Sequence, residues 1–211
     1  MFPLGTVLVP GMLLPLHVFE PRYRRMLGDC LAADGTFGVV LIERGSEVGG
    51  GDVRTDVGTR ARVVQAEELA DGRWAVVAVG QDRIRVDRWL PDDPYPRAEI
   101  SDWPDDPASG AAAGDRPDPR PGIVGRLRRA AALASELGLS AAPLDLELDD
   151  DPVAASYQAS LAAPLGPADR QALLAAPLLS DRWTLLELFL ENQVELMEAR
   201  LAFGDDARPD S

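Results

Sequence analysis

The residue types that carry most enzyme chemistry are nearly missing from this 211-residue chain. All 21 basic residues are arginine, and the sequence contains no lysine. A P-loop needs a lysine against the β- and γ-phosphates, and Schiff-base chemistry needs a lysine amine. A Ser-Lys protease dyad is excluded for the same reason. Arginine cannot substitute, because its guanidinium stays protonated at any working pH and is a poor base or nucleophile.

Histidine and cysteine occur once each, as His17 and Cys30. A histidine-based zinc site would need cysteine or carboxylate partners near His17, and none cluster there. One cysteine allows neither an intramolecular disulfide nor a CxxC pair. We expect His17, between Leu16 and Val18, to be a structural, hydrogen-bonded residue rather than a pH-sensitive or ligand-contacting one. We expect Cys30 to be a buried, inert thiol on the apolar stripe of a helix.

The carboxylates offer no better candidates for catalysis or metal binding. An oxygen cage for a divalent cation needs ligands at alternating positions around a defined turn. The acidic runs lie instead beside proline or glycine and are typical of solvated loop charge. The triple glycine at 49–51 lacks the Gly-Lys-Ser continuation of a phosphate-binding loop. We therefore expect no catalytic residue, no metal site and no cofactor. The acidic runs are Asp92-Asp93, Asp105-Asp106, Asp149-Asp150-Asp151 and Asp205-Asp206.

The formal net charge is −14, and its sign bears on possible partners. Residues 1–103 carry 12 arginines against 16 acids, and residues 122–211 carry 7 against 15. Nucleic-acid modules usually present a basic face, so we expect no nucleic-acid partner. No apolar run approaches the roughly 18 residues of a membrane helix. A single cysteine and no secretory leader favour a cytoplasmic location.

The first half of the chain is typical of short strands with one helix. Asp71-Gly72 predicts a tight hairpin turn, and Glu43–Asp56 predicts a mobile hairpin tip. Turns about every ten residues indicate a closed or strongly curved antiparallel sheet. The expected strands are Phe2–Val9, Met12–Leu16, Thr36–Ile42, Arg60–Leu69, Arg73–Val79, Ile84–Leu90 and Tyr95–Trp103.

The expected helix of this half is Glu20–Ala33. Pro21 suits a first helical position, and the Glu20 carboxylate suits the positive end of the helix. Apolar residues recur at a helical spacing and predict one buried stripe. That stripe comprises Tyr23, Met26, Leu27, Cys30 and Leu31.

The second half predicts helices after a proline-rich linker. We expect a β subdomain over 1–103, a linker or disordered loop over 104–121, a helical subdomain over 122–203 and a frayed tail over 204–211. The last helix has Ser180 at an N-cap-like position. The expected helices are Gly122–Leu139, Pro152–Ala163, Pro167–Ala176 and Ser180–Phe203.

The segment Leu14–Leu27, reading LPLHVFEPRYRRML, resembles the signature of the Lon protease N-terminal, or Lon substrate-binding, domain family. The resemblance continues through Phe2-Pro3-Leu4 and Val9-Pro10-Gly11 upstream, and through Phe37–Ile42, Val57-Gly58-Thr59 and Gly80–Val86 downstream. It is strong to about Trp103 and covers the helical half in outline. It implies an α+β fold: an N-terminal PUA-like curved antiparallel β-barrel with one packed helix, then a C-terminal helical bundle.

The resemblance also singles out signature residues, for which we expect structural roles. Glu20 is expected to cap the helix, and Arg22 to pair with a nearby acid. The residues that bind polypeptide are not assigned. The signature residues are Pro15, His17, Phe19, Glu20, Pro21, Arg22, Tyr23, Gly38, Gly58, Gly80 and Arg83.

Three functions follow as hypotheses. The first is a non-catalytic module that recognises unfolded or short-lived proteins through exposed apolar segments. The second is an adaptor or regulator with one dedicated protease or chaperone partner. The third is a PUA-like binder of small molecules or RNA, which the acidic charge opposes. We do not expect an enzyme, and the oligomeric state is left open.

Overall fold

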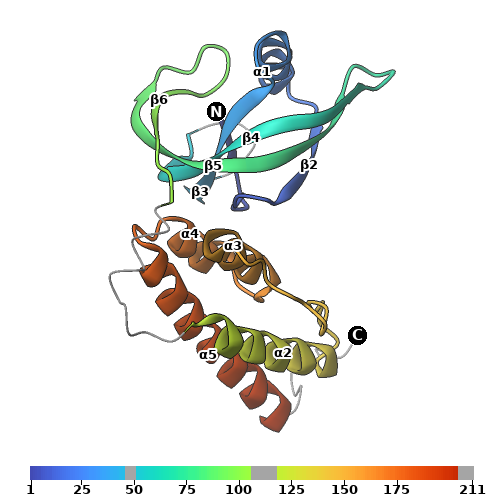
Figure 1. The fold of residues 1–211 in the computed structure, drawn as a ribbon. Coiled ribbons are helices and arrows are strands. Elements are labelled where there is room, and N and C mark those ends of the chain that lie inside the picture. The colour runs from blue at the N-terminus through green and yellow to red at the C-terminus, as the bar shows by residue number, and fades with distance from the viewer. Residues whose placement is uncertain (46–50, 106–117, 204–211) are drawn as a thin grey trace. The chain divides into compact units, whose positions relative to one another are not determined.

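A computed structural model of the chain describes residues 1–45, 51–105 and 118–203. It forms two compact units, Met1–Asp105 and Asp106–Ser211, which Figure 1 shows as a sheet-rich part and a helical part. Most of the expected linker (residues 106–117), the expected tail (204–211) and the centre of the expected hairpin tip (46–50) lie outside the described residues.

The first unit is a six-stranded mixed sheet with one helix. The strand order is β1-β3-β4-β5-β2, and β6 also pairs with β5. β1 runs parallel to β3, and every other pair is antiparallel. The elements are β1 (Phe2–Leu4), β2 (Leu13–Val18), α1 (Pro21–Ala32), β3 (Thr36–Arg44), β4 (Val53–Glu68), β5 (Trp74–Leu90) and β6 (Arg97–Asp102).

We expected a closed or strongly curved antiparallel sheet, and the structure differs from a closed, purely antiparallel one in two respects. β1 joins β3 in parallel, because β2 and α1 lie between them in the chain and provide the crossover that a parallel pair requires. In the described residues the pairing path ends at β1 and β2, so the sheet is open.

β5 explains the open arrangement. β4 pairs with it from Trp74 to Arg85, whereas its other edge is shared. β2 takes Trp74–Val79 and β6 takes Ile84–Leu90. We expected two strands here, but Gly80 stays in the ladder opposite Ala61 and β5 is continuous.

α1 lies against one face of the sheet (Figure 1). Its buried residues Tyr23, Met26 and Leu27 share a core with Leu14 and Val18 of β2. Pro21 opens the helix as predicted. The predicted stripe is too wide, since Cys30 is only half-buried and Leu31, at the margin of the helical wheel, is exposed.

The three signature glycines of the sheet sit where the backbone or side chains approach closely. A Cβ at Gly58 would meet the carbonyl oxygen of Val39, and a Cβ at Gly80 would meet that of Val9. At Gly38 it would meet the side chains of Met1 and Ile84. Gly58 and Gly80 therefore require the absence of a side chain because backbone atoms approach them, whereas at Gly38 the ends of two side chains would have to shift.

The second unit is helical: α2 (Arg120–Glu136), α3 (Pro152–Ala162), α4 (Pro167–Leu174) and α5 (Leu179–Phe203). All four helices were predicted, with two differences at their starts. α2 begins at Arg120, inside the range expected to be linker. α5 begins at Leu179, so Ser180 lies in its first turn and is not the N-cap. At α3 the Asp151 carboxylate does cap, accepting from the Ala154 amide at 3.0 Å.

A buried arginine holds this unit together. Arg182 of α5 is fully buried. Its Nε donates to the Leu173 carbonyl of α4 at 3.1 Å, and another guanidinium nitrogen donates to Ser156 Oγ of α3 at 3.0 Å. The guanidinium also stacks on the Tyr157 ring, 4.1 Å from its centroid. One side chain thus joins three helices.

We predict that Gly58→Ala lowers the free energy of unfolding by roughly 1–3 kcal/mol, because the new methyl group meets the Val39 carbonyl in a rigid ladder. The measurement is urea unfolding followed by circular dichroism. Gly28→Ala is the matched control. Gly28 is exposed within α1 with open space around it, so alanine should raise stability by about 0.5–1 kcal/mol. Equal effects of the two substitutions would contradict the packing role.

Candidate functional site

Among the described residues of the first unit, one face of the sheet carries no helix, and apolar side chains are exposed on it. Along β2, Leu14 and Val18 point into the core, so Leu13, Pro15 and His17 point the other way. All three are exposed, Leu13 at 62%, and Phe19 just beyond β2 is 55% exposed. Exposed apolar side chains that form a contiguous patch can mark an interaction surface.

The same face continues onto β5 and β4. Val79, Val77 and Ala75 of β5 lie directly opposite Leu13, Pro15 and His17 and are half-buried. Directly opposed side chains of an antiparallel pair share a face. Val64, in the register shift of β4, is also exposed. We call this set the outer face: Leu13, Pro15, His17, Phe19, Val64, Ala75, Val77 and Val79.

The free edge of β2 borders the outer face. The Gly80 amide donates to the Met12 carbonyl at 2.9 Å, and in an antiparallel ladder the groups facing the partner alternate along the strand. The backbone groups of Leu13, Pro15 and His17 therefore point away from β5, toward the free edge. Pro15 provides only a carbonyl there, which weakens the edge as a template for another strand.

Polar residues of β4 rim the outer face. Arg62, Gln65 and Glu67 pair with Val79, Val77 and Ala75 and are exposed. Arg62 donates to the Asp34 carbonyl at 3.0 Å. The side-chain and backbone hydrogen bonds from Thr36 hold the pKa of the Asp34 carboxyl below its usual range. The face thus has an apolar centre and a polar margin, as recognition surfaces commonly do.

The next signature residues fix the start of α1. The Glu20 carboxylate makes no capping bond, contrary to expectation, because it accepts from Arg22 Nε at 3.0 Å. The Arg22 guanidinium lies 4.6 Å from the centroid of Tyr23, and Tyr23 stacks on Phe2 at 4.2 Å. Burial raises the pKa of Tyr23 to about 12.

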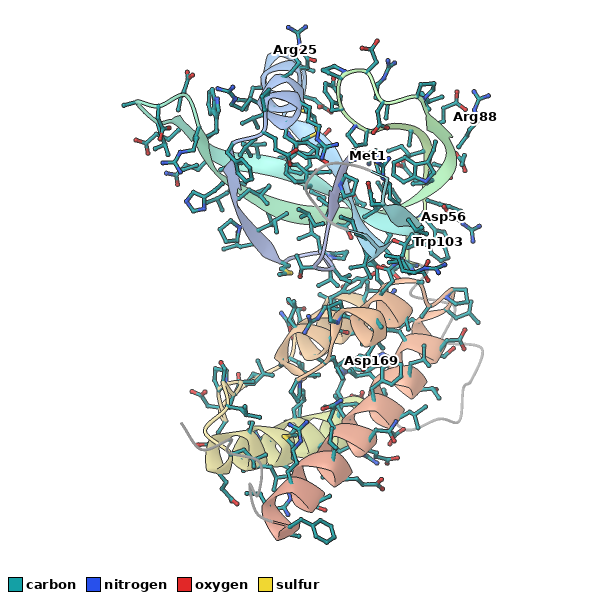
Figure 2. The ribbon with its side chains drawn as sticks, turned by 180° about the vertical axis from the view of Figure 1, so that it is seen from behind. Met1, Arg25, Asp56, Arg88, Trp103 and Asp169 are labelled. Atoms are coloured by element: carbon teal, nitrogen blue, oxygen red, sulfur yellow. The ribbon has the colours of Figure 1, made fainter. Side chains whose placement is uncertain are left out.

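Arg83 is buried on β5 and belongs to a different cluster. It pairs with Asp105 at 2.8 Å and lies 4.3 Å from the centroid of Trp103. The Trp103 amide donates to the Arg83 carbonyl at 3.0 Å. Arg25 and Arg88, labelled with Trp103 in Figure 2, are by contrast exposed on the surface. The structure therefore divides the signature: Pro15, His17 and Phe19 are on the outer face, and the others are at the start of α1 or inside the unit.

Sequence reasoning did not identify Leu13, Val64, Val77 or Val79 as members of a surface. The signal that could have found them is the pairing of β2 with β5, which no local pattern encodes. The His17 side chain is exposed and its backbone groups face the free edge of β2, so the structural, hydrogen-bonded role that we expected for it stays a prediction.

Groups suited to catalysis or metal binding do not gather in the described part of the chain. Residues 1–45, 51–105 and 118–203 contain no group of three His, Cys, Asp or Glu side chains that could hold a metal ion. Burial raises the pKa of the Cys30 thiol, which disfavours the reactive thiolate. A cavity of about 240 Å³ beside α2 is lined mainly by alanine and has no titratable side chain.

The family model for the ATP-dependent protease La (LON) substrate-binding domain matches residues 1–192. The chain belongs to this family. The predicted resemblance is therefore confirmed, and it extends from the signature segment through most of the helical unit.

Several Lon proteases are relatives of this Lon-family chain. Lon protease 1 of Herpetosiphon aurantiacus is 24% identical over 204 residues, and Lon protease 2 of the same organism is 26% identical over 197 residues. Each match covers 92% of this chain but 24% of the relative. The chain thus spans about a quarter of the length of these relatives.

Solved structures of the family share the fold. The Lon N-terminal domain protein of Xanthomonas campestris is 26% identical with a TM-score of 0.59, covering 94% of this chain and 95% of that one. The N-terminal domain of the Mycobacterium avium complex Lon protease gives a TM-score of 0.57 at 18% identity, covering 90% and 97%. Among the described residues, no helix is both long enough and apolar enough to span a membrane.

Tyr23 should make stability pH-dependent in the alkaline range. An unfolded tyrosine ionises near pH 10, whereas the folded group holds its proton to about pH 12. The free energy of unfolding should therefore fall as the pH rises from about 10 toward 12. Tyr23→Phe should show a smaller fall in urea unfolding across this range. If the slope is unchanged, Tyr23 ionisation does not contribute.

Arg83→Leu should destabilise the first unit by about 3 kcal/mol, because it leaves the half-buried Asp105 carboxylate without this cation. Arg88→Leu, on the same strand, removes an exposed pair with Glu99 and should change stability by less than about 1 kcal/mol. Thermal unfolding of both variants gives the comparison. Similar melting shifts for the two would argue against a special role for Arg83.

Proposed function

We propose that this chain is a non-catalytic module that recognises exposed apolar segments of unfolded proteins through its outer face. The observation that carries the proposal is the exposure of Leu13 and Pro15 on the edge strand β2 and of Phe19 just beyond its end. Membership of a substrate-binding domain family supports it. The curated relatives are proteases, but the absence of lysine excludes a Ser-Lys dyad within this chain.

The chemistry of the face suits apolar segments rather than one fixed sequence. Burial contributes about 25 cal/mol per Å² of apolar surface, and the ordering of a flexible client subtracts from that. A small set of aliphatic and aromatic side chains should then give affinities on the order of 1–100 µM. The polar rim would keep charged parts of a client in water. An apolar centre with a polar rim therefore favours weak binding to many different clients.

The direct test uses a permanently unfolded probe, reduced and carboxymethylated α-lactalbumin with a fluorescent label. Fluorescence anisotropy should show saturable binding. Leu13→Ser/Phe19→Ser should weaken it at least tenfold, because each buried large apolar side chain contributes about 1.5–3 kcal/mol. Leu144→Ser is the matched control, since Leu144 in the helical unit is 61% exposed. It should leave affinity unchanged.

Two results would refute the proposal in different ways. No binding by the unmodified chain rejects polypeptide recognition, and equal losses in the double variant and the control reject the outer face. Cross-linking in lysate then separates the alternatives. Enrichment of many unfolded or short-lived proteins supports the module, whereas one stoichiometric protease or chaperone supports a dedicated adaptor.

A further inference from the structure

α5 carries a second apolar stripe besides the one that faces the bundle. Its core-facing residues are Trp183, Leu186, Leu190 and Met197. The second stripe lies about 140° away around the helix axis. Its members are spaced 4-3-4-3-4, the a/d pattern of a coiled-coil seam. We call it the α5 seam: Leu185, Phe189, Asn192, Leu196, Ala199 and Phe203.

The C-terminal part of the α5 seam is exposed. Leu185 and Phe189 are half-buried against the bundle core, but Leu196 is 46% and Phe203 is 82% exposed. Leu188 beside the seam is exposed as well. The family match ends at residue 192, so the exposed part lies beyond the region that the family model describes.

The charged residues of α5 from Glu187 onward separate into two groups. Glu187 and Glu191 pair with Arg126, and Glu198 pairs with Arg129, all on the side of α2. Glu195 and Arg200 flank the seam on opposite sides. Both are exposed, and neither has an ion-pair partner among the described residues.

We propose that the α5 seam is a parallel dimer interface that pairs this chain with a second copy of itself. In heptad terms Glu195 is at position g and Arg200 is at the following position e. A parallel pair brings each g residue to the e residue five positions on in its partner. Glu195 of each copy then meets Arg200 of the other, and twofold symmetry forms the ion pair twice.

The same charges favour an antiparallel pair less. In an antiparallel pair g faces g and e faces e. When two seams overlap along their whole length, the two Glu195 side chains then face each other and Arg200 lies opposite Leu186, so neither charge meets an opposite one. Asn192 supplies one polar layer within the seam, at a d position.

Sedimentation of the full chain over about 5–200 µM tests the interface. We expect a concentration-dependent shift from monomer to twice the monomer mass. Glu195→Arg and Arg200→Glu should each weaken the dimer at least fivefold, and the double exchange Glu195→Arg/Arg200→Glu should restore it. Both positions are exposed, so circular dichroism should show unchanged folding. A monomer throughout the range, or no recovery in the double variant, would overturn the proposal.

Cross-linking tests the orientation independently. In a Cys30→Ser background, Ala199→Cys places a thiol at a d position, which faces its own copy only in a parallel pair. Mild oxidation should give a disulfide-linked dimer. Ser135→Cys, exposed on α2, controls for random collision and should stay largely monomeric. Equal cross-linking at both positions would contradict a parallel seam.

Discussion

The ladder along β5 is the constraint on which the sheet unit depends. This strand is the longest of the sheet, and it serves three neighbours. Gly80 marks the point where β2 gives way on its edge, because the Met12 carbonyl bonds the Gly80 amide and the Val9 carbonyl lies over its Cα. A side chain at position 80 would keep the segment before β2 from approaching β5. β2 would then no longer be held with one particular face toward the core.

The orientation of β2 connects the fold with the proposed function. Leu14 and Val18 are buried in the core under α1 together with Tyr23, and the alternate residues Leu13 and Pro15 are exposed on the opposite face. The residues that β2 buries therefore determine which of its residues are exposed. Arg22 contacts both Glu20 and Tyr23 at the start of α1, and these contacts hold Phe19 next to the exposed residues of β2. The signature segment thus combines residues that stabilise the unit with residues that remain available for binding.

Sequence reasoning succeeded where the controlling chemistry is local. Proline at the first turns of α3 and α4, and Asp151 before α3, located those helices within a few residues. It failed where the cause is distant in the chain. The run Leu13-Leu14-Pro15-Leu16 is apolar on both faces, so no alternation reveals which face is buried. In the sequence, Gly80 resembles a break between two strands, and only the close approach of the Val9 carbonyl explains why a glycine stands within a continuous strand. Arg182 resembles a surface arginine until three helices surround it.

Pro15 has a consequence for how long a bound segment would stay. On the free edge of β2 it offers an acceptor without a donor, so an added strand could pair fully only at Leu13 and His17 on either side. Backbone contacts this few cannot propagate into a stacked sheet. A captured chain would be retained mainly by its side chains and would exchange rapidly, which suits a sorting step in which clients are sampled and passed on rather than stored.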